Sequence, residues 1–248
     1  MLVVVAYVLD APGIERRRAQ LGHVELSPEL TFDFRPVRAG VEATNDYHDH
    51  LFKNVAVFEA ACEAQNEGYS AVCIDTVGDS AVEPLRSVLD IPVIATGRSA
   101  YLLALTLGRR FSILTYRPWL WEAHAQLAEY GLADKCASVR AIEAEPNVVD
   151  LMEGKEGDLF PRFVAAAEQC IEDGADTIVL HSTTLHQVAE HVTAALGIPV
   201  VNPGPYSYKL AETMLGLGLS HSHIAYPRSA RPQLRMAHTM IDSVATDS

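Results

Sequence analysis

The chain contains an internal repeat that limits the folds it can adopt. The first copy spans residues 69–108 and the second spans residues 175–218. Each copy reads as a strand, a turn, a helix, a short strand that begins with Ile-Pro, and a second helix. Solenoid repeats have periods of about 20–50 residues, so this longer period indicates a duplicated half-domain. Matching positions are separated by 106 or 107 residues: Thr76 with Ser182, and Tyr101 with Tyr208.

Strands and helices alternate along the chain. Apolar, β-branched runs bounded by turn residues predict strands at 2–8, 71–75, 92–96, 111–116, 176–180 and 198–201. Stretches with helical spacing, each followed by a glycine, predict helices at 52–65, 99–107, 119–130 and 160–172. This alternation is typical of parallel βαβ units with helices on both faces of the sheet.

The predicted fold class is therefore α/β. We expect one unit over residues 1–248, built from two Rossmann-like half-domains related by a pseudo-twofold axis, each a mostly parallel sheet flanked by helices. Half-domain A is predicted to comprise about 1–110 with the C-terminal segment 205–248, and half-domain B about 111–204. The strand at 2–8 then belongs to half-domain A, and the strand at 111–116 belongs to half-domain B.

Two hydroxyl side chains mark the expected site. Thr76 and Ser182 each follow a predicted strand at its carboxyl end, where open α/β sheets bind ligands. If the half-domains face each other there, they enclose a small polar active crevice. The alternative is that both hydroxyls only cap the helices that follow, because Ser and Thr are favoured at that position.

Composition and charge exclude several classes of protein. Hydrophobic residues make up 49% and charged residues 21% of the chain, as in an ordinary globular protein. With 19 basic and 32 acidic residues the net charge is −13, which disfavours a nucleic-acid surface. No run approaches the roughly 18–20 apolar residues of a membrane span, and the N-terminal MLVVVAYVLDAPG is interpreted as a strand rather than a signal peptide. We expect a cytoplasmic protein with neither nucleic-acid nor membrane partners.

The sequence lacks the signatures of cofactor and metal sites. No glycine-rich phosphate loop or dinucleotide fingerprint follows a strand, and the histidine spacing fits no metal site, so we expect no organic cofactor and no metal. The short basic cluster Arg16-Arg17-Arg18 is interpreted as solvent-exposed. Four cysteines show no CxxC motif and are predicted to be reduced core thiols: Cys62, Cys73, Cys136 and Cys170.

Three segments, 40–80, 90–115 and 173–219, resemble the aspartate/glutamate/hydantoin racemase superfamily, and its hydantoin racemase-like branch most closely. The resemblance covers roughly half of the chain. It implies a cofactor-independent reaction on a small molecule and a homo-oligomeric assembly. In the racemases of this superfamily two cysteines, one on each half, remove and deliver a proton next to a carbonyl. A thiol suits this role because its pKa, near 8.5, is easily lowered.

Both cysteines of the resemblance are replaced in this chain. The first position lies in Thr76-Val77-Gly78-Asp79 and the second in His181-Ser182-Thr183-Thr184. An alcohol is far less acidic than a thiol, so a hydroxyl needs a neighbouring base to react. On a strand, consecutive side chains point to opposite faces, which separates His181 from Ser182. The candidate catalytic residues are Thr76, Ser182, His181 and His186, with His48, His50 and Asp79 as further candidate bases.

The two turns also predict where a substrate binds. Backbone N–H groups near helix N-termini, together with short hydroxyls, suit a small carboxylate or an enolate oxygen. The candidate substrate-binding residues in the turns are Gly78, Asp79, Ser80, Thr183 and Thr184. The resemblance adds Tyr7, Thr115 and Tyr116 at the ends of other strands, and Tyr47 and His48 at the start of a helix.

The function predicted from these features is that of a cofactor-independent isomerase of the racemase superfamily. Its substrate would be a small carboxylate or a hydantoin-like cyclic amide, converted through an enolate-like intermediate by chemistry that does not use cysteine. One alternative is a hydrolase or a lyase/decarboxylase on the same scaffold. The other is a non-catalytic protein that binds a small carboxylate.

Overall fold

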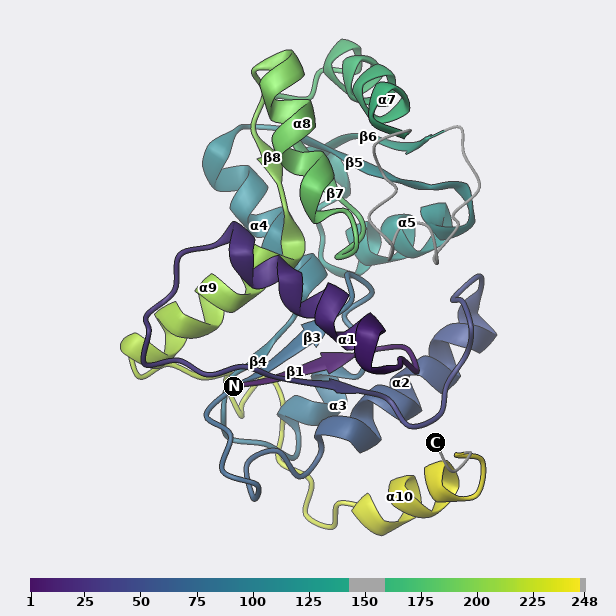
Figure 1. Cartoon of the computed structure of the whole chain (residues 1–248), viewed down its shortest axis with the longest axis vertical. Coiled ribbons are helices and arrows are strands. Elements are labelled where there is room, and N and C mark those ends of the chain that lie inside the picture. Colours follow the sequence, from purple (N-terminus) through teal and green to yellow (C-terminus); the bar gives the residue numbers. More distant parts are fainter. Residues whose placement is uncertain (143–158, 246–248) are drawn as a thin grey trace. The chain divides into compact units, whose positions relative to one another are not determined.

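The computed structural model describes residues 1–142 and 159–245, and it divides into two compact units. The first unit comprises Met1–Ala95 and Ser207–Ser248, and the second comprises Thr96–Tyr206. Each unit contains one four-stranded sheet in which every paired strand runs parallel to its neighbour. The predicted α/β class, with two parallel sheets flanked by helices, is therefore confirmed (Figure 1).

In the first unit the strands lie in the order β2-β1-β3-β4. Apolar side chains point alternately to the two faces of this buried sheet, so both faces carry a core. Helices α2 and α3 pack on one face, with α10 behind α2, and α1 and α9 pack on the other. The bounds of these elements are β1 Leu2–Val5, α1 Ala11–Arg18, the 3-10 helix η1 Ala19–His23, β2 Asp33–Pro36, α2 Tyr47–Ala61, β3 Val72–Asp75, α3 Val82–Arg86, β4 Val93–Ile94, α9 Pro203–Gly216 and α10 Leu234–Asp242.

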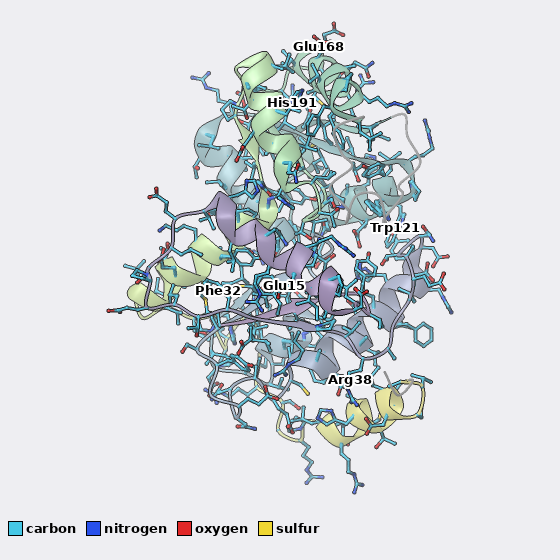
Figure 2. The ribbon with its side chains drawn as sticks, in the orientation of Figure 1. Glu15, Phe32, Arg38, Trp121, Glu168 and His191 are labelled. Carbon is cyan, nitrogen blue, oxygen red and sulfur yellow. The ribbon has the colours of Figure 1, made fainter. Side chains whose placement is uncertain are left out.

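Side-chain contacts attach the C-terminal part of the chain to this sheet. Phe32, labelled in Figure 2, packs edge-on against the ring of Tyr208 on α9, with centroids 5.6 Å apart. Arg38, also labelled there, donates hydrogen bonds to Asp242 on α10 and to Glu59 on α2. The helices α9 and α10 therefore complete the first unit.

The second unit has the same arrangement. Its strands lie in the order β6-β5-β7-β8, with α7 and α8 on one face and α4 and α5 on the other. The bounds of these elements are α4 Thr96–Leu107, β5 Phe111–Tyr116, the 3-10 helix η2 Arg117–Trp119, α5 Leu120–Glu129, the 3-10 helix η3 Ala133–Lys135, β6 Cys136–Ile142, α7 Phe160–Glu172, β7 Thr177–Leu180, α8 His186–Leu196 and β8 Val200–Val201. In both units the strand of the repeat that precedes the hydroxyl, β3 or β7, is an inner strand.

Helix α4 belongs to the second unit. It packs on β5, β7 and β8, so the boundary falls after Ala95, whereas the sequence-based division ran to about residue 110. The repeat supplies the reason: α4 follows β4 as α9 follows β8, and from Ser207 onward α9 lies in the first unit. Each helix that ends a repeat copy thus packs in the unit that did not supply the preceding strand.

Strands β2 and β6, helices α1 and α10 and the 3-10 helices were not predicted from the sequence. Strands β2 and β6 lie at sheet edges and are only partly buried, so they lack a continuous apolar run. Helix α1 contains Pro12 and Gly13 but begins where the Asp10 side chain accepts the Gly13 N–H at 2.8 Å. The first strand ends at Val5, earlier than the predicted residue 8.

Among residues 1–142 and 159–245, no helix has both the length and the apolarity needed to cross a lipid bilayer.

The turn between α4 and β5 depends on a carboxylate and a glycine. Asp176 accepts hydrogen bonds from the backbone N–H groups of Arg109 and Arg110 at 2.8–3.1 Å. A Cβ atom on Gly108 would overlap both the Asp176 carboxylate and the Thr177 hydroxyl. The absence of a side chain at residue 108 therefore permits the hydrogen bonds that close this turn.

We predict that Gly108→Ala lowers the free energy of unfolding by about 1–3 kcal/mol, because an added methyl group in a packed site forces neighbouring atoms to move. Urea denaturation monitored by circular dichroism measures this change. Gly22→Ala is the matched control, since a Cβ there meets nothing within 4 Å. Equal stability of the two variants would contradict the prediction.

Candidate active site

The turn that follows β3 is organised by Thr76. The Thr76 side chain is buried, and its Oγ1 accepts a hydrogen bond from the backbone N–H of Gly78 at 3.3 Å. Helix α3 begins only at Val82, after the N-cap residue Ala81, and no side chain caps it. Thr76 is therefore a turn residue that binds the backbone two positions later, a known arrangement for short hydroxyl side chains.

The turn that follows β7 repeats this arrangement. Ser182 is buried, and its Oγ accepts a hydrogen bond from the backbone N–H of Thr184 at 3.2 Å. The Ser182 Oγ also lies 2.7 Å from the Thr184 hydroxyl. Helix α8 begins at His186 without a side-chain cap. The alternative in which Thr76 and Ser182 serve as helix N-caps is thus wrong, since both helices start several residues later.

The backbone of the first turn is strained. Asp79 and Ala81 have φ angles of 48° and 57°, and they are the only non-glycine residues with positive φ in the described parts of the chain. An alanine in this left-handed region costs about 1–2 kcal/mol. The Asn54 side chain on α2 holds the turn by accepting the Ala81 N–H at 3.1 Å. Strain of this kind concentrates at functional sites.

Two further predicted site residues carry buried hydroxyls. Ser80 is fully buried, and its hydroxyl has no hydrogen-bond partner among the described residues. The Thr115 hydroxyl at the end of β5 is likewise buried and unbonded in this part of the chain. Thr183 is 4% exposed and Gly78 is buried, whereas Asp79 is partly exposed.

The predicted aromatic residues lie in different environments. The Tyr116 ring packs edge-on against Trp119 and Phe163 in the core of the second unit, because it points to the sheet face opposite Thr115. Tyr7 is half-buried after β1, in the first unit. Tyr47 is 69% exposed at the start of α2, so its ring faces solvent.

His48 also lies on the exposed start of α2, near two acids. Asp46, His48 and Asp49 bring possible ligand atoms within 4.8 Å of one another. Both carboxylates already bond the helix start: Asp46 accepts the Asp49 N–H and Asp49 accepts the Asn45 N–H, each at 3.0 Å. This group is therefore explained by capping of α2.

The two candidate histidines, His181 and His186, have different surroundings. His181 is 1% exposed; its Nδ1 lies 2.9 Å from the Tyr101 hydroxyl on α4, and its Nε2 lies 3.4 Å from the Glu122 carboxylate on α5. Both ring nitrogens thus face partners other than Ser182, as the alternation of side chains along a strand predicts. His186 is the first residue of α8 and is partly buried, close in sequence to the Ser182 turn.

A buried ion pair beside Thr76 was not predicted from the sequence. Arg17, interpreted as solvent-exposed, is 5% exposed and pairs with Asp75, the residue before Thr76, at 2.6 Å. Arg16 and Arg18 are more accessible, so the interpretation was wrong for the middle residue of the cluster. The signal in the sequence was Asp75 itself, because an acid within a buried strand requires a partner.

None of the four cysteines lies at the turns. All are free thiols, and burial raises the pKa of Cys62 and Cys73 to about 12 and that of Cys136 and Cys170 to about 11. A thiol with these values holds few thiolate ions near neutral pH, so none is suited to act as a base or nucleophile.

We predict that the native protein releases almost no colour with Ellman's reagent at pH 8, and that unfolding in guanidinium exposes all four thiols. At that pH a thiol of pKa 11 is ionised in about one molecule in a thousand. Rapid reaction of one thiol in the native state would contradict the raised pKa values.

A separate cavity of about 380 Å³ lies between α2 and α10 in the first unit. Its lining is mostly apolar and includes Phe52, Val55 and Met240. It contains none of the predicted site residues, so the chemistry suggested by the sequence does not belong to it.

Comparisons with known proteins converge on one family. A family model described as Asp/Glu/Hydantoin racemase matches residues 18–211. A hydantoin racemase from Rhizobium meliloti is 29% identical over 170 residues, which cover 67% of this chain and 70% of that protein. A hydantoin racemase from Pseudomonas sp. (strain NS671) is 26% identical over 188 residues, which cover 75% of each chain. Among solved structures, an allantoin racemase from Klebsiella pneumoniae superposes with a TM-score of 0.81 at 25% identity, over 93% of this chain and 94% of that one.

Proposed function

Because the chain belongs to the Asp/Glu/hydantoin racemase family, we propose that it isomerises a small carboxylate or a hydantoin-like cyclic amide without using cysteine or a cofactor. The observation that carries this proposal is the hydroxyl turn found after both β3 and β7. In each turn the hydroxyl oxygen accepts a hydrogen bond from the backbone N–H two residues later. The similar proteins are named as racemases of hydantoin and allantoin, which are cyclic amides.

Each turn retains a hydroxyl proton that a substrate can accept. The Thr76 oxygen accepts the Gly78 N–H, so its own O–H stays available to donate. Ser182 and Thr184 share one bond between two hydroxyls, which leaves the proton of the other hydroxyl for a ligand. Removing a proton next to a carbonyl places negative charge on the carbonyl oxygen, and fixed donors stabilise such an oxygen. We therefore assign polarisation of the substrate to Thr76 and Ser182.

The proton itself requires a stronger base than an alcohol. Asp79 lies in the Thr76 turn and is partly exposed, and His186 opens the helix after the Ser182 turn. We assign proton transfer to these two residues, because a carboxylate and an imidazole are the usual general bases of enzymes.

The proposal predicts exchange of a substrate proton with solvent. We expect a hydantoin or a small 2-substituted carboxylate incubated with the protein in deuterated water to gain deuterium at the carbon next to the carbonyl, as read by proton NMR. A ring-opened or decarboxylated product would replace isomerisation by hydrolysis or C–C bond cleavage. Saturable binding without exchange or product would identify a binding protein and overturn the proposal.

Removal of either hydroxyl should lower kcat for this exchange by about a hundredfold, the usual loss for one donor to a developing oxyanion. Thr76→Val and Ser182→Ala test this, and Thr76→Ser is the matched control that keeps the hydroxyl. Steady-state kinetics, measured in both directions of the isomerisation, give the effect on kcat. Full activity in Thr76→Val or in Ser182→Ala would contradict the role assigned to that hydroxyl.

A further inference from the structure

The residue before each turn hydroxyl is a buried ionisable side chain. Asp75 precedes Thr76 and is 3% exposed, and His181 precedes Ser182 and is 1% exposed. An ionisable group removed from water costs free energy unless it is paired and hydrogen-bonded. Each strand that leads into a hydroxyl turn therefore has to end among polar partners supplied by other elements.

In the first unit these partners come from α1 and η1. The Arg17 Nε donates to the Asp75 carboxylate at 2.7 Å, and its Nη2 donates to the Asp75 backbone carbonyl at 3.3 Å. Gln20 donates to the same carboxylate at 3.3 Å. Tyr208 on α9 is fully buried nearby, and burial, with the Asp75 charge as the second cause, raises its pKa well above the ordinary value.

In the second unit the partners come from α4 and α5. The Tyr101 hydroxyl lies 2.9 Å from the His181 Nδ1 and donates to the Gln126 side chain at 2.9 Å. Glu122 follows Trp121, which is labelled in Figure 2, and its carboxylate faces the His181 Nε2 at 3.4 Å. The rings of Tyr101 and His181 are nearly parallel, with an angle of 5° between their planes. All four side chains of this network are at most 6% exposed.

The two networks place similar residue types at similar separations along the chain but exchange their charges. In the first the strand carries the acid and the helix carries the cation, whereas in the second the helix carries the acid. The matched pairs, separated by 105 to 107 residues, are Asp75 with His181, Arg17 with Glu122, Gln20 with Gln126, and Tyr208 with Tyr101.

We propose that His181 is a positioning residue, which with Tyr101 and Glu122 fixes the end of β7 and thereby the Ser182 hydroxyl. The function of this positioning rests on the proposed role of Ser182. The main chain runs directly from His181 into Ser182, so a displacement of the imidazole moves the turn.

The imidazole is held by side chains from two separate helices. Glu122 on α5 faces its Nε2 and Tyr101 on α4 faces its Nδ1, and Gln126 on α5 in turn accepts the Tyr101 hydroxyl. The orientation of His181 therefore depends on both helices.

The test uses backbone amide NMR of the whole chain, which needs no substrate. We expect Tyr101→Phe and Glu122→Gln to displace the Thr183 and Thr184 amide signals, while the Gly78 amide signal stays constant. Tyr208→Phe is the matched control, because the Tyr208 hydroxyl has no hydrogen-bond partner among the described residues.

Thr183 and Thr184 amide signals that do not move in either variant, or that move as far in Tyr208→Phe, would overturn the proposal. These outcomes are independent of turnover, so they are distinct from a failure of the proposed reaction.

If the protein isomerises a substrate, activity gives a second reading. We expect Tyr101→Phe to lower kcat about tenfold to a hundredfold, with KM changed little, because misplacement of a reacting group by a fraction of an ångström has effects of this size. Glu122→Gln should have the same effect on kcat and KM, whereas Tyr208→Phe should leave kcat unchanged. Normal kcat in both Tyr101→Phe and Glu122→Gln would refute positioning through His181.

Discussion

The buried ionisable residue at the end of each inner strand is the constraint on which much of this structure depends. Asp75 and His181 are almost fully removed from water, so each has to be paired within the protein. The partners of Asp75 fix α1 and η1 against the first sheet, and the partners of His181 fix α4 and α5 against the second. The packing of these helices and the placement of the hydroxyl turns thus have a common cause.

The hydroxyl turns result from the same requirement that buried polar groups be hydrogen-bonded. A chain that leaves a buried strand and has not yet begun a helix must satisfy its N–H groups locally. Thr76 and Ser182 do so by accepting the N–H two residues later, at 3.3 and 3.2 Å. Their hydroxyl protons are then the groups that remain for a ligand, which suits them to polarise a carbonyl rather than to remove a proton.

Much of the architecture and part of the site were predictable from the sequence. The apolar runs and the repeat predicted two parallel sheets, and the family resemblance is confirmed by the family model that matches residues 18–211. The repeat also identified Thr76 and Ser182 as equivalent, and the structure gives them the same turn. Strands β2 and β6 escaped prediction because edge strands are only partly buried, so they lack the apolar signal of inner strands.

By itself the sequence determined the period of the duplication, the inner strands and the position of each hydroxyl, because these depend on residues close together in the chain. Only the tertiary structure decided that Arg17 is buried against Asp75, that α4 joins the second unit, and that Tyr116 enters a core while His181 turns to Tyr101 and Glu122. The physical reason is that a buried polar group takes whichever partner the packing brings within hydrogen-bond distance. These partners lie up to 80 residues away, so no local pattern specifies them.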